Sequence, residues 1–165
     1  CEKHRLRWYG QTYLGHALTA LDELEKAEEV YRQAISLGYE MQKTHQAIEA
    51  QAGLARVSMA CGDTEQALTQ VEEILMYLEN EVPSMGHPLD GTKEPFRILL
   101  TCYQVLKANH DPRSNTILED AYNLLQTRAA NISDDYLRYC FLNNVAVNRE
   151  IVEVYEKNRL GALKT

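Results

Sequence analysis

Apolar residues recur at intervals of three and four along most of the chain, which is the spacing of one face of an α-helix. Near the N-terminus this spacing links leucines 14, 18, 21 and 24. The acidic pair Asp22-Glu23 favours a break followed by a new helix, and Gly38 can close that helix in the left-handed conformation. We therefore predict helices over residues 3–20 and 23–37.

A second pair of helices follows the first. Residues 41–61 are rich in Ala, Gln and Glu, which are good helix formers. Gly62 is a stop signal, and Asp63 with Gln66 three residues later is close to a capping box, so a new helix is predicted from there to Glu79. Two prolines and two glycines then predict a loop over residues 80–93.

The remainder of the chain repeats the same signals. Thr92 is a candidate N-cap with Pro95 in the first turn, which predicts a helix to residue 109. Asp111-Pro112 starts another helix, to residue 130. A short helix after Ser133 and a last one over residues 148–158 complete an all-α fold of about eight helices.

The first two pairs can be aligned at an offset of 40 residues. Gly15, Ala27 and Tyr31 of the first pair correspond to Ala55, Ala67 and Val71 of the second. A small residue on each helix lets two backbones approach, and a large apolar residue fills the space beside it. A weaker third copy runs from residue 96 to residue 125, so antiparallel helical hairpins are predicted in succession.

This pattern resembles the tetratricopeptide repeat. The leading Trp of that family is replaced by Gln11 and Gln51, and the 40-residue offset exceeds the family's usual length of about 34 residues. The resemblance implies a right-handed superhelix of hairpin units, at residues 3–38, 41–80 and 94–130, with terminal helices over 133–158. All of these would form a single repeat domain.

A second resemblance covers roughly residues 90–152. Residues 90–106, 121–134 and 141–151 resemble the C-terminal tail of large bacterial regulators, in which a signal-transduction ATPase module precedes tetratricopeptide-like repeats. The likeness implies a cytoplasmic protein–protein interaction, scaffold or sensor module of a signalling or transcriptional regulator, without catalysis of its own. The chain begins with Cys rather than Met, and we expect it to be a fragment of a longer protein.

The net charge of −7 is unevenly distributed. Residues 1–93 hold 8 basic and 15 acidic residues, whereas residues 94–165 hold 9 of each. Nucleic acid requires a concentrated basic surface, and the basic cluster at residues 3–7 is too short to provide one, so no nucleic-acid partner is expected. No run of about 18 apolar residues is present, so no membrane partner is expected either.

Sequence motifs for catalysis are absent. The chain has no phosphate-binding glycine loop and no zinc-binding helix motif, and its five histidines lack metal spacing, so we expect no metal and no cofactor. The four cysteines are widely spaced, which indicates free, buried thiols. A helical enzyme that uses Cys61 or Cys102 with a distant histidine remains an alternative.

The first helix of each hairpin lines the inner surface of such a stack, and its residues that are not needed for packing would meet a protein or peptide. A small ligand on the same surface is the other possibility. Trp8 either packs in the core or once packed on a preceding repeat. By helical phase the inner-surface candidates, with Thr19 as a further position of the first helix, are Tyr9, Thr12, His16, Glu49, Arg56, Met59, Glu94, Arg97, Thr101 and Gln104.

Overall fold

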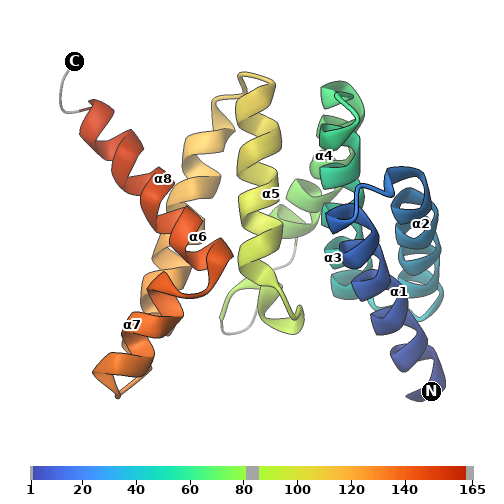
Figure 1. Ribbon diagram of the computed structural model, residues 1–165, viewed down its shortest axis with the longest axis horizontal. Coiled ribbons are helices and arrows are strands. Elements are labelled where there is room, and N and C mark those ends of the chain that lie inside the picture. Colours follow the sequence, from blue (N-terminus) through green and yellow to red (C-terminus); the bar gives the residue numbers. More distant parts are fainter. Residues whose placement is uncertain (1, 81–85, 163–165) are drawn as a thin grey trace.

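A computed structural model describes the backbone of residues 2–80 and 86–162 and the side chains of residues 7–80 and 86–161. The side chains of the basic residues 3–6 and the loop residues 81–85 lie outside this described part. The described part contains helices and turns without a strand, and the helices follow one another along the longest axis (Figure 1). They are α1 (Glu2–Ala20), α2 (Leu24–Glu40), α3 (Thr44–Ala60), α4 (Thr64–Asn80), the 3-10 turn η1 (Pro88–Gly91), α5 (Pro95–Ala108), α6 (Arg113–Ala130), α7 (Asp135–Asn143) and α8 (Ala146–Ala162).

The predicted all-helical fold is confirmed, and most helix ends lie within three residues of their expected positions. Gly62 has a φ of 80°, and Oδ1 of Asp63 accepts a hydrogen bond from the backbone N–H of Gln66 at 2.9 Å. Glycine and a short acidic side chain therefore end α3 and begin α4, as local chemistry predicts.

Gly38 does not end the second helix, which continues to Glu40 and is followed by Gln42 in the left-handed conformation (φ 55°). A Cβ at Gly38 would lie 2.9 Å from the backbone nitrogen of Ala47. The glycine is needed because α3 begins against it, which is a reason that only the tertiary structure reveals.

Thr92 does not cap the fifth helix, which begins at Pro95 without a side-chain cap. Its hydroxyl instead donates to the carbonyl of Leu89 at 2.7 Å and closes η1. The predicted loop therefore contains a short helical turn, whose Leu89 is fully buried.

Consecutive helices pack in pairs, α1 with α2, α3 with α4 and α5 with α6. Each pair then packs on the next, because α3 contacts α1 and α2 on one side and α5 on the other. At the C-terminal end the order changes: α8 packs against both α5 and α6, and α7 contacts α6 and α8 (Figure 1).

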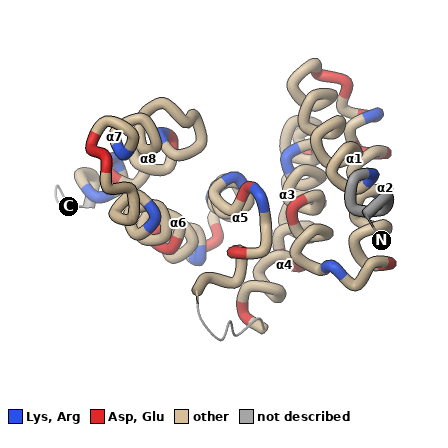
Figure 2. Tube along the Cα trace, turned by 90° about the horizontal axis from the view of Figure 1, so that it is seen from below, with Lys and Arg blue, Asp and Glu red and all other residues tan. Residues whose placement is uncertain are grey.

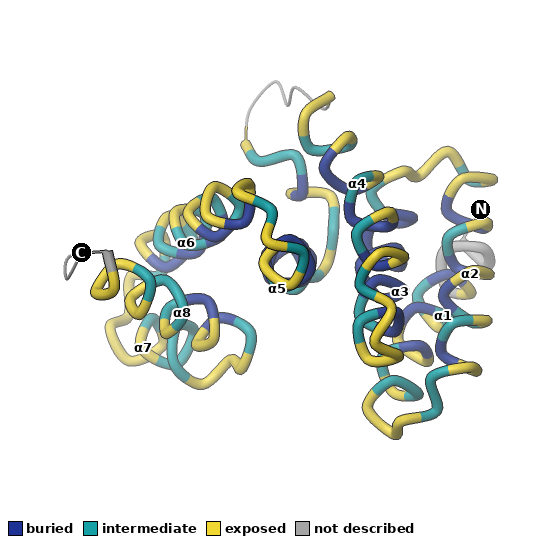
Figure 3. The backbone as a smooth tube through the Cα atoms, turned by 90° about the horizontal axis from the view of Figure 1, so that it is seen from above, coloured by how far each residue is buried: buried dark blue, intermediate teal, exposed yellow. Residues whose placement is uncertain are grey.

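Two hydrophobic cores share α3. The first is formed by α1, α2 and one side of α3, and the second joins the other side of α3 to α4, α5, α6 and α8. Most of α3 is consequently buried, as the dark segments of Figure 3 show. The many alanines of α3, together with Gly53, suit a helix that is packed on several sides, because small side chains let neighbouring backbones approach.

Tyr31 stands at the centre of the first core and is fully buried. A Cβ built on Gly15 would lie 2.6 Å from the Tyr31 ring, and one built on Gly53 would lie 2.2 Å from it. The aromatic ring is thus clamped between the backbones of α1 and α3.

The leucine spacing in the first helix does not mark its buried face. Leu14 and Leu21 are 49% and 69% exposed, whereas Trp8 and Thr12 are fully buried. With Gly15 they form the face of α1 that packs on α2 and α3, so the structure supports the core-packing interpretation of Trp8. The reason is the clamp on Tyr31, which requires a glycine rather than a leucine on this face.

Candidate partner-binding face

We call the surface formed by α1, α3 and α5 the inner face. The middle helix α3 contacts both α1 and α5, whereas α2 and α4 make no extensive contact in the described chain.

The first helix presents Tyr9, Tyr13 and His16 to the inner face. The Tyr13 ring is 45% exposed and meets the His16 ring edge-on at 5.5 Å, and the charges of Glu94 and Glu49 help burial to raise the pKa of Tyr13. The helical phase did not select Tyr13, because the leucine pattern predicted an inward face of α1 that is rotated by about one residue from the observed face. A signal was available in the spacing of residues 9, 13 and 16, which recur at intervals of four and three.

Three candidates are not surface residues. Thr12 is fully buried, and Glu49 and Thr101 are each 2% exposed. They lie where α3 packs against α1 and α5, so a partner on the surface does not touch them directly. The expectation that they would form the exposed part of the inner face is corrected on this point.

A polar network joins four helices beneath the inner face. The hydroxyl of Tyr31 donates to Nδ1 of His16 at 2.6 Å. Arg56 donates from Nη2 to the same ring nitrogen at 3.1 Å and from Nη1 to Oγ1 of Thr101 at 3.3 Å. Three of these residues were inner-surface candidates from the sequence, and Tyr31, which comes from α2, was not among those candidates.

The network determines the protonation of His16. A guanidinium only donates hydrogen bonds, so Nδ1 is the acceptor and Nε2 carries the proton. Burial, followed by the charges of Arg56 and Arg97, lowers the pKa of His16 to about 3. The imidazole is therefore neutral at physiological pH.

Arg56 has no acidic partner. Its hydrogen-bond acceptors are the neutral groups of His16, Thr101 and Tyr31, and within the described chain no carboxylate oxygen lies within 4.0 Å of the guanidinium nitrogens. Burial lowers the pKa of Arg56, against the opposing influence of Tyr31. A partly buried cation with neutral partners alone is an uncommon arrangement, because buried charges are normally paired.

Charged residues at the start of α5 continue the inner face. The carboxylate of Glu94 pairs with the guanidinium of Arg97, and Oε2 of Glu49 accepts the backbone N–H of Lys93 at 3.0 Å. Burial raises the pKa of Glu49 although the Lys93 hydrogen bond lowers it. The Lys93 ammonium lies 5.9 Å from the centre of the Tyr9 ring, within the range of a cation–π contact.

The last two candidates lie at the sides of the face. Met59 is partly buried and packs on the second core. Nε2 of Gln104 donates to Glu150 of α8 at 2.8 Å, so α8 extends the surface beyond α5.

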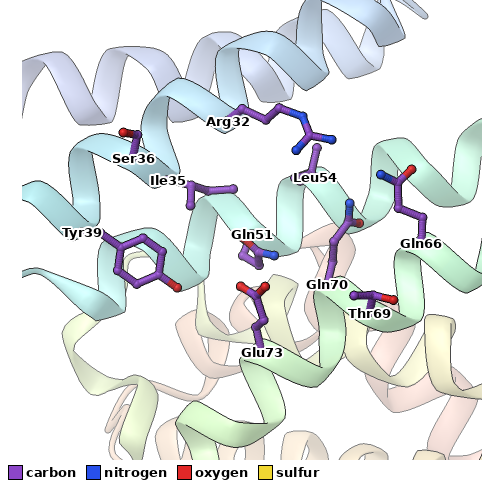
Figure 4. Close-up of a pocket in the computed structure, with 10 residues that line it drawn as sticks. All are labelled: Arg32, Ile35, Ser36, Tyr39, Gln51, Leu54, Gln66, Thr69, Gln70 and Glu73. Carbon is purple, nitrogen blue, oxygen red and sulfur yellow. The ribbon is translucent and has the colours of Figure 1, made fainter.

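On the other side of the array, α2 and α4 stand apart and leave an open groove of about 480 Å³ above α3 (Figure 4). Six of its ten lining residues carry an amide or a hydroxyl group, and Ile35 and Leu54 are apolar. The residues that line it are Arg32, Ile35, Ser36, Tyr39, Gln51, Leu54, Gln66, Thr69, Gln70 and Glu73. None of the inner-face candidates belongs to this groove.

The cysteines differ in exposure. Cys102 is fully buried, and burial raises the pKa of its thiol to about 12, so it is an inert thiol of the second core. Cys61 is exposed in the turn after α3 and Cys140 is partly exposed, which corrects the expectation that all the thiols are buried.

The described residues contain no cluster of three or more His, Cys, Asp or Glu side chains that could hold a metal ion. None of the helices described is long and apolar enough to cross a membrane. Basic and acidic residues are interspersed along the tube in Figure 2, without a continuous basic stripe in that view.

The pH dependence of stability provides a test of the network. Because the His16 pKa is lower folded than unfolded, the unfolded chain binds the additional proton, and stability is lost as pH falls below about 6.5. We expect the free energy of unfolding to fall by about 1–2 kcal/mol through His16 between pH 7 and pH 5, a value reduced for partial exposure of the ring.

Urea titrations of wild type and His16→Gln at both pH values measure this contribution. Glu49 acts in the opposite direction. Burial raises the pKa of its carboxyl, so protonation of Glu49 stabilises the folded protein as pH falls. This contribution is present in both proteins. An equal loss of stability in the two proteins would contradict a neutral, buried His16.

No family model, curated protein or solved structure matches the chain. What the inner face does is therefore inferred from its own geometry.

Proposed function

We infer that this chain is a partner-binding module that holds a protein or peptide segment on its inner face. The hairpins would form a tetratricopeptide-like superhelix, in which such a face is the binding surface. The module would serve as the interaction or sensor part of a bacterial multidomain regulatory ATPase, in agreement with the resemblance of residues 90–152, and it would carry out no catalysis itself.

The observation that carries this proposal is Arg56, a partly buried cation at the centre of the inner face whose partners are all neutral. A fold rarely retains a buried charge without a counterion unless the charge has a further use. The polar groups around it are spread over α1, α3 and α5 rather than gathered at one enclosed cavity. An extended segment can contact such a surface along its length, whereas a small ligand would be buried on one side only.

The experiment uses two tyrosines of matched exposure. Tyr13 lies on the inner face and is 45% exposed, and Tyr39 lines the groove on the other side and is 47% exposed. The purified chain selects binders from a bead-bound library of random 12-residue peptides, and their affinities are then measured for both alanine variants. We expect Tyr13→Ala to weaken binding about tenfold, an ordinary loss for a truncated aromatic contact, and Tyr39→Ala to change it less than about twofold.

Selection of no peptide would refute the proposal. So would peptides whose affinity falls with Tyr39→Ala and not with Tyr13→Ala, because they would bind the opposite side of the array.

A further inference from the structure

We propose that Arg56, with Arg97 beside it, is a carboxylate subsite that binds one acidic side chain of the peptide held on the inner face. This inference rests on the function proposed above and names the chemistry of the partner. The subsite consists of the two guanidinium groups and the network that orients Arg56.

The hydrogen bonds of Arg56 leave much of its donor capacity unused. A guanidinium has five N–H groups, and the acceptors around Arg56 are one ring nitrogen and two hydroxyls. Two of the three distances are long, at 3.3 Å to Thr101 and 3.5 Å to Tyr31. A carboxylate would provide the shorter, charge-assisted and bidentate geometry that arginine prefers.

The fold does not need Arg56 to satisfy its neighbours. The Tyr31 hydroxyl already donates to His16, and the Thr101 hydroxyl donates to the backbone carbonyl of Arg97 at 2.7 Å. Removing the guanidinium leaves both of these hydrogen bonds in place. The network therefore orients the arginine, and the arginine does not hold the network together.

A second cation stands next to Arg56. The positive charge of Arg97 acts on Arg56 and on His16, and its side chain is 40% exposed. Glu94, whose charge also reaches Arg56, is engaged by Arg97. A carboxylate that arrives from outside would engage the unused donors of Arg56 and the exposed part of Arg97, which it would share with Glu94.

Charge explains why the partner would offer one carboxylate rather than a run of them. Arg56, Arg97 and Lys93 outnumber the neighbouring carboxylates of Glu49 and Glu94 by one. The whole chain, however, carries a net charge of −7, which repels a polyanion. A segment with one acidic residue among neutral ones fits both conditions, and Tyr9 and Tyr13 provide aromatic surface for its other side chains.

Arg56→Met serves as the folded control. Because it removes a partly buried cation and leaves its neighbours hydrogen-bonded, we expect a melting temperature equal to that of the wild type or higher by about 2–4 °C. Arg32→Met removes an exposed arginine that is paired with Glu28 on the other side of the array, and it is the matched variant for the loss of a positive charge. A large fall in the melting temperature of Arg56→Met would show that the guanidinium is structural and would overturn the inference.

The binding test uses the peptides selected above, whose C-termini are attached to the bead and offer no terminal carboxylate. We expect one enriched Asp or Glu position. Its replacement by Asn or Gln should weaken binding to the wild type and to Arg32→Met about 10- to 100-fold, the usual size of a charge-assisted contact, and should change binding to Arg56→Met less than about threefold.

Four results of the binding test would overturn the inference. Peptides that depend on Tyr13 but show no acidic enrichment would leave the proposed function intact and refute the subsite alone. If Arg56→Met still binds the acidic peptides more tightly than their Asn or Gln counterparts, the acidic side chain contacts a residue other than Arg56. If acetate raises the melting temperature of the wild type and not of Arg56→Met while acidic peptides show no preference, the subsite serves a free small carboxylate instead. Selection of no peptide would refute the proposed function and this inference together.

Discussion

Gly53→Ala is expected to destabilise the fold by about 3 kcal/mol, at the upper end of the usual cost of overpacking. The added Cβ would lie 2.2 Å from Cε1 of Tyr31, closer than real Cβ atoms come to any neighbour. The ring cannot move away, because the backbone of Gly15 holds its other side and the side chain is fully buried. Either α3 shifts from α1 and α2 or Tyr31 leaves its rotamer.

Urea unfolding followed by far-ultraviolet circular dichroism measures this cost. Gly10→Ala is the matched control, because nothing lies within 4 Å of its Cβ position and alanine favours a helix by up to about 1 kcal/mol. In the background of Tyr31→Ala the substitution at Gly53 should lose most of its cost, since the clamped ring is gone. Equal stabilities of the Gly53→Ala and Gly10→Ala variants would show that the ring is not clamped.

Trp8→Ala is expected to cost about 3–4 kcal/mol, the usual range for removal of a large buried aromatic residue. Trp8 is fully buried in the first core, among residues of α2 and α3. Trp8→Phe should cost far less, because it retains most of the apolar volume and removes an indole N–H that is buried without an acceptor.

Thermal unfolding of the two variants tests this expectation, and equal melting temperatures would contradict it. Trp8 is the single tryptophan of the chain, so its fluorescence in the wild type reports on the first core alone. Because α3 belongs to both cores, the fluorescence and circular dichroism transitions should coincide. An earlier fluorescence transition would mean that α1 and α2 unfold separately.

Arg56 illustrates how stability and binding can oppose each other. Arg56 is a cation among neutral partners. For this reason Arg56→Met is expected to keep or raise the melting temperature, and for the same reason Arg56 suits a carboxylate that comes from outside the chain. Proteins commonly retain such locally unfavourable groups where a ligand supplies the missing partner.

The sequence predicted the helices well because their signals are local. Gly62, Asp63 and Pro95 act on the backbone next to them, and their effects do not depend on distant residues. The small residues repeated at an offset of 40, such as Ala27 and Ala67, were correctly predicted to be buried. The same reasoning placed His16, Arg56 and Thr101 on one side of the chain, and the structure brings their side chains together.

The rotation of the first helix could not be derived from its leucines. The face of α1 that is buried carries Trp8, Thr12 and Gly15, whereas Leu14 is exposed. Hydrophobicity alone therefore selects the wrong face, because the contact depends on the absence of a side chain at Gly15. The requirement for glycine at position 15 becomes evident only when the group that packs against it, the Tyr31 ring, is known.

By itself, the sequence determined the number of helices, most of their bounds to within three residues, the succession of hairpins and the uneven distribution of charge. These follow from backbone preferences and periodicity, which act over a few residues. The tertiary structure alone decided that Gly38 faces α3, that Thr12 and Thr101 are buried, and that no carboxylate of the described residues pairs directly with Arg56. Each of these depends on which atoms of distant segments meet, and the free energy of such a contact is not a property of either segment alone.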